Sequence, residues 1–156
     1  MSSCDLPADP RPPVPPARSR VMPLFHGPGA GDPFFWQGIP SAAYKPPDGS
    51  HRGVSRFVLA GETGERTAFH VRYFEVAPGG HTTLERHAHE HVVVVLRGRG
   101  QVRLGGDLHA LAFGDTVYVA PGEVHQLRNT SPDEPFGFLC VVDAVRDRPS
   151  AVAGPA

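Results

Sequence analysis

Metal-capable side chains gather in two short segments that are framed by glycines, residues 79–98 and 114–129. Imidazole and carboxylate groups together suit divalent Fe, Mn, Ni, Cu or Zn. Residues two apart on a β-strand project to the same face, so one strand can offer two ligands to a single ion. We therefore expect one metal site built from both segments. Its candidate ligands are Glu85, His87, His89, His91 and His125.

The two segments resemble the signature motifs of the cupin family, small β-barrels that hold one metal ion inside. The family's first motif is a glycine, five residues, His-x-His, three or four residues, a glutamate, six residues and a glycine. Its second motif is a glycine, five residues, Pro-x-Gly, two residues, a histidine, three residues and an asparagine. The resemblance spans residues 69–142, and its many fixed intervals make it specific. It implies an all-β fold, the double-stranded β-helix or jelly-roll barrel, with one divalent transition metal as cofactor.

The intervals of the first motif decide which of the neighbouring histidines match the family's ligands. Every interval is met when the fixed positions are Gly79, Glu85, His87, His91 and Gly98. If His87 and His89 formed the His-x-His pair, the intervals would fail. A continuous strand would also separate the Cα atoms of residues 87 and 91 by about 13 Å, too far for one ion. A turn at residues 88–90 must therefore fold the chain back, and it lifts His89 away from the metal.

On this register the resemblance implies a cupin site whose carboxylate has changed place. Glu85 stands where the first histidine is usual, and His91 stands where the glutamate is usual. Three imidazoles and one carboxylate are thus kept. The implied ligands are Glu85, His87, His91 and His125. Two roles stay open for Glu85, metal ligation or orientation of a water or substrate, and His89 is an alternative ligand or a support for one.

The elements that position these residues read as short strands separated by turns, which is typical of an all-β barrel. Alternation along residues 67–76 places Phe69, Val71 and Tyr73 on one face and the residues between them on the other. Gly105-Gly106 reads as a hairpin turn. The expected strands are 56–60, 67–76, 82–87, 91–96, 100–104, 107–111, 116–119, 125–129 and 136–143.

The chain divides into an arm, one barrel and a tail. Twelve of the eighteen prolines lie in the first fifty residues, and proline cannot continue a helix or a central strand. We expect a proline-rich arm over residues 1–54 with a disordered start, a cupin barrel over 55–145 and a flexible tail over 146–156. The aromatic run 34–36 would be costly to leave in water. It packs either on its own barrel or on a second subunit, in a homodimer that exchanges the arm.

Composition argues against several classes of partner. The formal charge of −1 and a pI near 6.7 give no bias toward nucleic acid or an anionic membrane. The two cysteines, Cys4 and Cys140, do not predict a structural disulfide, which fits a reducing compartment. No secretion signal is visible, and the longest apolar run, Val92 to Leu96, is too short to span a bilayer. We expect a cytoplasmic protein that binds a small molecule.

Three functions are compatible with such a site, because cupins share a fold while catalysing unrelated reactions or none. Four protein ligands would leave two positions of an octahedral ion for substrate. The leading hypothesis is an Fe- or Mn-dependent oxygenase, of the dioxygenase type, that binds a small organic molecule at the metal. The second is an isomerase, epimerase or lyase that uses the metal as a Lewis acid, with Glu85 or Tyr73 transferring a proton. The third is a non-enzymatic barrel that binds a small ligand or regulates a partner.

The substrate pocket is expected to be largely apolar. Its wall is assigned to Tyr73, Val93, Phe113, Leu127, Phe136 and Phe138. The position of Glu85 separates the two enzymatic hypotheses. A free carboxylate near an open metal face favours proton transfer, whereas a carboxylate bound to the metal favours the oxygenase.

Overall fold

The computed structural model describes residues 17–154, and these residues form strands that all pair antiparallel. The expected disorder at the start of the arm falls on residues 1–16, which lie outside the described residues. The strands are β1 (Leu24–His26), β2 (Phe34–Trp36), β3 (Ala42–Ala43), β4 (Arg52–Ala60), β5 (Phe69–His81), β6 (Glu85–Arg86), β7 (His91–Arg97), β8 (Gly100–Leu104), β9 (Asp107–Leu111), β10 (Thr116–Val119), β11 (His125–Asn129), β12 (Phe136–Asp143) and β13 (Ser150–Ala151).

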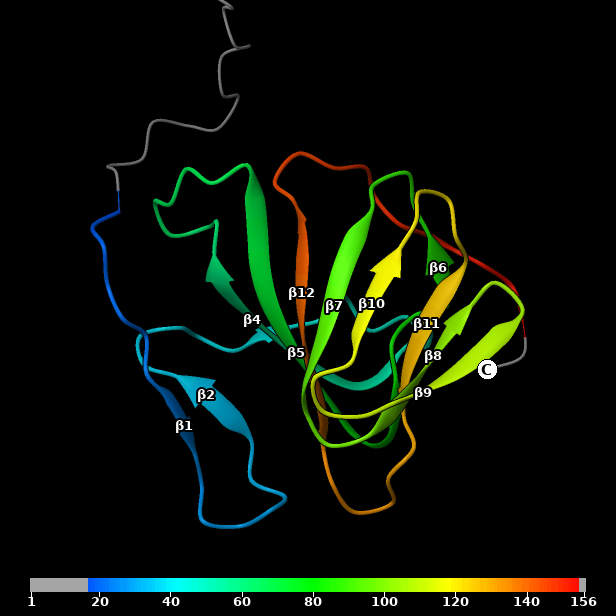
Figure 1. The fold of residues 1–156 in the computed structure, drawn as a ribbon, viewed down its shortest axis with the longest axis horizontal. Coiled ribbons are helices and arrows are strands. Elements are labelled where there is room, and N and C mark those ends of the chain that lie inside the picture. The colour runs from blue at the N-terminus through cyan, green and yellow to red at the C-terminus, as the bar shows by residue number, and fades with distance from the viewer. Residues whose placement is uncertain (1–16, 155–156) are drawn as a thin grey trace, which may run out of the picture.

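The sheet curls on itself into the barrel of a cupin, and the long strand β5 joins its two walls (Figure 1). Neighbouring strands of the sheet follow the order β10-β7-β12-β5-β11-β6-β13. In addition, β4 pairs with β5, and the β8–β9 hairpin pairs with β11 through β8. Near its end β5 passes close to β4: a Cβ atom at Gly80 would lie 2.5 Å from the carbonyl oxygen of Arg52. Only glycine fits such an approach, which explains one of the two adjacent glycines that begin the first motif.

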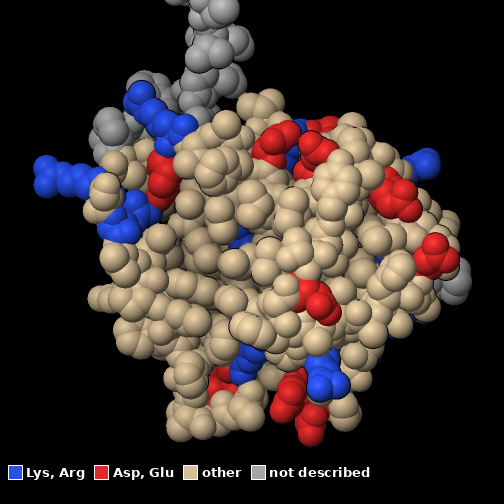
Figure 2. Space-filling view, in the orientation of Figure 1, with Lys and Arg blue, Asp and Glu red and all other residues tan. Residues whose placement is uncertain are grey.

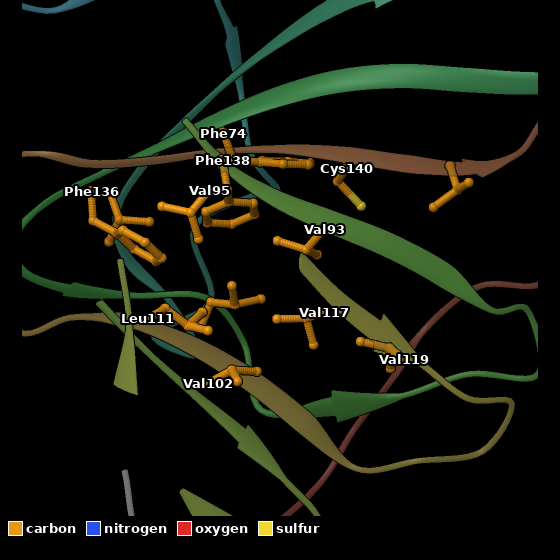
Figure 3. Close-up of a cluster of buried hydrophobic side chains, with 13 residues drawn as sticks. Phe74, Val93, Val95, Val102, Leu111, Val117, Val119, Phe136, Phe138 and Cys140 are labelled. Carbon is orange, nitrogen blue, oxygen red and sulfur yellow. The ribbon is translucent and has the colours of Figure 1, made fainter. Parts of the chain in front are cut away.

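Side chains from both walls fill the barrel. Along β12, alternate residues point inward, as the period of a strand requires. Figure 3 shows Phe136 and Leu111 toward one end of this core and Cys140 and Val119 toward the other. The core consists of Phe74, Val76, Val93, Val95, Val102, Leu111, Val117, Val119, Leu127, Phe136, Phe138, Cys140 and Val142. Apolar burial on this scale is the main force that closes the barrel.

A second apolar cluster lies on the outer face of β4 and β5, where part of the arm covers the barrel. Trp36 is 8% exposed, and its ring lies 4.7 Å from that of Tyr73 and 5.6 Å from that of Phe57. Phe34 stacks on Tyr73 as well. The neighbouring Phe35 is half exposed and stacks on Phe25. Of the two arrangements left open by the sequence, the described arm thus packs on its own barrel, and the homodimer stays a prediction.

The segment after β12 is built into the fold, which differs from the flexible tail that its composition predicts. Ser150 pairs with Arg86, and Ala151 pairs with Glu85. The carboxylate of Asp147 accepts hydrogen bonds from the backbone N–H groups at positions 88 and 89, at 2.8 and 2.9 Å. Strand pairing and a capping carboxylate therefore hold a segment that has few apolar side chains.

Charged side chains on the face seen in Figure 2 are scattered among uncharged ones, so this face carries no continuous basic surface. Within residues 17–154, no helix has the length and apolar character needed to cross a membrane.

Packing of the arm on the barrel can be tested with two adjacent aromatic residues. Trp36→Ala should lower the free energy of unfolding by about 3 kcal/mol, because it removes a large buried ring. Phe35→Ala should lower it by about 1 kcal/mol or less, since that ring is half exposed. Urea titration followed by circular dichroism measures both. Equal small losses would mean that the Trp36 contact contributes little to stability.

Candidate metal centre

Three histidines from separate segments of the chain meet at one end of the barrel interior. His87 follows β6, His91 opens β7 and His125 opens β11. All three are buried, and one ligand atom from each lies within 4.8 Å of the other two. Nε2 of His91 is 3.2 Å from Nε2 of His125. Such a convergence of imidazole nitrogens suits one transition-metal ion.

Hydrogen bonds on the far side of each ring fix its orientation. Nδ1 of His87 donates to the carbonyl oxygen of His89 at 2.6 Å, and Nδ1 of His125 donates to that of Glu123 at 2.9 Å. A carbonyl only accepts, so in these two rings the proton sits on Nδ1 and Nε2 keeps its lone pair. Nδ1 of His91 lies 3.0 Å from the sulfur of Cys140. This is the arrangement by which proteins prepare histidines as metal ligands.

The interior keeps these imidazoles neutral. Burial lowers the pKa of His91 to about 2, with further lowering by the nearby His125 and His87. Burial also lowers the pKa of His87 and that of His125. Because a metal competes with a proton for the same lone pair, neutral rings are the form that binds the ion.

The structure bends the chain at Ala88 and His89, where the sequence predicts a turn. The His89 ring stacks on that of His87 with centroids 3.6 Å apart, and its Nδ1 lies 2.7 Å from an oxygen of Asp147. Its carbonyl oxygen accepts the bond from His87. His89 thereby supports His87 from behind, although its ring also borders the cavity described below.

Glu85 lies beside the three histidines but outside their cluster. It pairs directly across from His125 on the neighbouring strand and is 8% exposed. Its Oε2 forms an ion pair with the ammonium group of Lys45. Within residues 17–154, the mutually close ligand atoms are those of the three histidines alone. Ligation by Glu85 therefore stays a prediction. Its partner Lys45 comes from the arm and was not predicted from the sequence.

A cavity of about 220 Å³ opens onto the histidines. Of the predicted wall, Leu127 and Phe138 line it. Val93 and Phe136 are fully buried in the core, and Phe113 is 74% exposed in a turn. None of these three borders the cavity. An inward strand position is thus not enough to reach the cavity, because only the end of the barrel interior near the histidines is hollow.

Tyr73 is also misplaced by the sequence prediction. It lies on the outer face of β5, where its hydroxyl donates to Glu75 at 2.8 Å and its ring packs under the arm. The inward face carries Arg72 and Phe74, both of which border the cavity. Alternation along β5 was correctly predicted, but the face toward the pocket was not. We conclude that Tyr73 is not placed to transfer a proton at this site.

Sequence reasoning missed the cationic side chains and the thiol of the cavity. Arg56 from β4, Arg72 from β5 and Arg146 after β12 all line it. Cys140 lies directly across from Arg72, whose Nη2 donates to the sulfur at 3.1 Å. Burial raises the pKa of the Cys140 thiol, so the sulfur is protonated at neutral pH. Arg72 could have been found, since it shares a face with the core residue Phe74.

Comparison with known proteins finds the cupin fold in the same part of the chain as the glycine-framed motifs. Residues 72–142 match the model of the Cupin domain. A protein of Rhodospirillum rubrum named 1-methylthio-D-xylulose 5-phosphate methylsulfurylase is 47% identical over 119 residues, which cover 73% of this chain and 72% of that protein.

Two solved structures agree in architecture. A cupin-2 domain from Rhodospirillum rubrum is 38% identical with a TM-score of 0.71, over 91% of this chain and 85% of that one. A cupin 2 conserved barrel domain protein from Rhodopseudomonas palustris is 41% identical with a TM-score of 0.69, over 76% and 80% of the two chains. The resemblance read from the glycine-framed motifs is confirmed, and the chain belongs to the cupin family.

Proposed function

We propose that this cupin is a metal-dependent enzyme that acts on a small phosphorylated keto-sugar, with the metal as a Lewis acid. The observation that carries the proposal is the composition of the cavity. It joins three buried histidines that suit a metal to a wall of arginines that suits an anion. Both sets of residues line the same cavity of about 220 Å³.

The relative from Rhodospirillum rubrum supports this substrate class. The compound in its name is a ketopentose with a methylthio group at one end and a phosphate at the other. The name describes no oxygen chemistry, so the leading expectation from the sequence, an oxygenase, gains no support. The second expectation, Lewis-acid catalysis by an isomerase, epimerase or lyase, agrees better with a keto-sugar.

The residues of the cavity have separate parts in such a reaction. His87, His91 and His125 would hold the metal, which when bound supplies a Lewis acid that polarises the substrate's carbonyl group. Leu127 and Phe138 give part of the cavity an apolar lining that limits water.

Glu85 is the group that we assign to proton transfer. Its Oε2 is held by Lys45, which orients the carboxylate and leaves Oε1 to take a proton. The C–H bond next to the carbonyl breaks, its electron pair moves toward the carbonyl oxygen, and the proton passes to Oε1. Return of a proton to carbon restores the carbonyl form of the sugar phosphate, so the step needs no oxidant or reductant.

Hydrogen exchange tests the proposed function directly. The protein, loaded in turn with Mn²⁺, Fe²⁺ and Zn²⁺, is incubated in D₂O with 1-methylthio-D-xylulose 5-phosphate. We expect deuterium to enter the carbons next to the carbonyl, as followed by ¹H NMR, because the proton on Glu85 exchanges with solvent. Dioxygen consumption is measured in parallel. Oxygen uptake without deuterium exchange would favour the oxygenase hypothesis. The absence of both oxygen uptake and deuterium exchange would favour a binding protein.

Metal binding is tested by removing one imidazole. Wild-type protein should carry about one ion per chain by elemental analysis, and His125→Ala should lose it, because two imidazoles bind an ion much more weakly than three. His109→Ala is the matched control, since His109 is exposed on β9 and lies outside the cluster. Metal retained at full stoichiometry in His125→Ala would show that the three histidines do not form the site.

The two roles of Glu85 predict different results for one substitution. As the proton-transfer group, Glu85→Gln should keep the metal and slow deuterium exchange by about 100-fold or more. If Glu85 is instead a fourth metal ligand, the Glu85→Gln variant should lose metal together with activity. His89→Ala is the comparison: loss of its support for His87 should weaken metal affinity by about tenfold. If His89→Ala removes the metal and Glu85→Gln does not affect exchange, the assignment of both residues is wrong.

A further inference from the structure

Three guanidinium groups share the cavity with the histidines. Arg56 and Arg72 lie on adjacent strands, where the register sets Arg56 opposite Phe74 and Arg72 opposite Val58. Neighbouring inward positions on paired strands bring their side chains to the same part of the barrel interior. Arg146 reaches the same cavity from the segment after β12. Elements far apart in sequence thus converge on one cationic wall.

The charge of this wall is not compensated by the protein. Among residues 17–154, no ion pair within 4.0 Å joins any of the three arginines to a carboxylate. Lys45, the other cation of the cavity, is already neutralised by Glu85. Nε of Arg56 and Nε of Arg72 are buried without a hydrogen-bond partner in this part of the chain. Buried donors of this kind on partly buried cations are costly unless an anion meets them.

A purely structural role would require these donors to be satisfied by the protein. Arg146 meets that requirement in part, because its Nη1 donates to the carbonyl oxygen of Asp143 at 2.8 Å. Arg72 lies over the ring of Phe74 at 5.0 Å and donates to the sulfur of Cys140. These contacts orient two of the guanidinium groups without cancelling their charge. The guanidinium group of Arg56 makes no hydrogen bond or ion pair with another described residue, so a structural role does not explain it.

The charges around Arg146 also indicate that the cationic wall lacks an anion among the described residues. Burial lowers its pKa, and the charge of Arg72 and, more weakly, that of Arg56 lower it further. Glu62 acts in the opposite direction but forms no ion pair with any of the three. Guanidinium groups that repel one another at a partly buried wall form an anion site, because a multiply charged anion reverses the repulsion and accepts several hydrogen bonds at once.

We propose that Arg56, Arg72 and Arg146 form the subsite that holds the phosphate group of the substrate, an inference that rests on the proposed function. Planar guanidinium groups match phosphate oxygens through paired hydrogen bonds. Arg72 is separated from the ligand His91 by the sulfur of Cys140 alone, at 3.1 and 3.0 Å. The phosphate and metal subsites are therefore neighbours, so a short sugar phosphate can place its phosphate in one and its carbonyl group in the other.

Binding of inorganic phosphate tests the subsite without any sugar. Isothermal titration is carried out on the full chain with metal and after chelation, because phosphate can also bind the metal. Arg56→Gln and Arg146→Gln should each weaken phosphate binding about 10- to 100-fold in both forms. Arg52→Gln is the matched control, an exposed arginine on the same strand as Arg56. Equal phosphate affinity in Arg56→Gln and Arg52→Gln would overturn the subsite.

Thermal melts establish that each variant folds. Arg72 supports Phe74 and Cys140, so its substitution is made as Arg72→Lys, which keeps the charge and loses the paired bonds. We expect this variant to retain part of the phosphate affinity, between that of wild type and that of Arg56→Gln. Full wild-type affinity in Arg72→Lys would remove Arg72 from the subsite.

A substrate comparison separates failure of the subsite from failure of the proposed function. Deuterium exchange is measured on 1-methylthio-D-xylulose 5-phosphate and on the same sugar without phosphate. Arg146→Gln should lower kcat/KM about 10- to 100-fold for the phosphorylated compound and little for the other. Equal loss for both would overturn the subsite while leaving the function intact. Arginine-dependent phosphate binding with no exchange on any sugar would keep the subsite and overturn the function.

Discussion

Three imidazoles face one another inside this barrel because the other nitrogen of each ring is held by a fixed partner. Without the carbonyl oxygens of His89 and Glu123, the rings of His87 and His125 could rotate or change tautomer, and their lone pairs would not meet. Burial reinforces the constraint, since it keeps the rings neutral where a charged imidazole would be unstable. The surrounding elements can be understood by how they supply these partners.

The partner of His87 depends on a segment distant in sequence. Asp147 binds two backbone N–H groups of the turn after His87, and this holds the carbonyl of His89 in place. The same segment continues into β13, which pairs with β6 beside Glu85. It also contributes Arg146 to the cavity. The segment after β12 thus fixes the orientation of His87, pairs with an edge strand and adds a cation to the cavity. Its composition alone does not predict these contacts.

The barrel and the cluster of three histidines were predictable because both depend on local spacing. The intervals from Gly79 to Gly98 identify His87 and His91 even with the carboxylate moved, and the need for a turn after His87 follows from strand geometry. The pocket wall was not predictable in the same way. Both faces of β5 carry buried apolar side chains, since the core covers one and the arm covers the other. Period-two alternation separates two such faces but does not say which is inward, and Tyr73 was assigned to the wrong one.

The exchanged carboxylate changes the charge distribution of the site. At position 85 the carboxylate lies across from His125 and within reach of Lys45. At position 91, the usual place in the family motif, it would begin β7 next to Cys140, on the side of the cavity that Arg72 occupies. A carboxylate there would pair with the arginine and neutralise part of the cationic wall. With histidine at 91 and glutamate at 85, Lys45 takes up the negative charge instead. The three arginines are then left without a carboxylate partner in the described part of the chain, as the proposed phosphate subsite requires, while the three histidines that could bind a metal stay together.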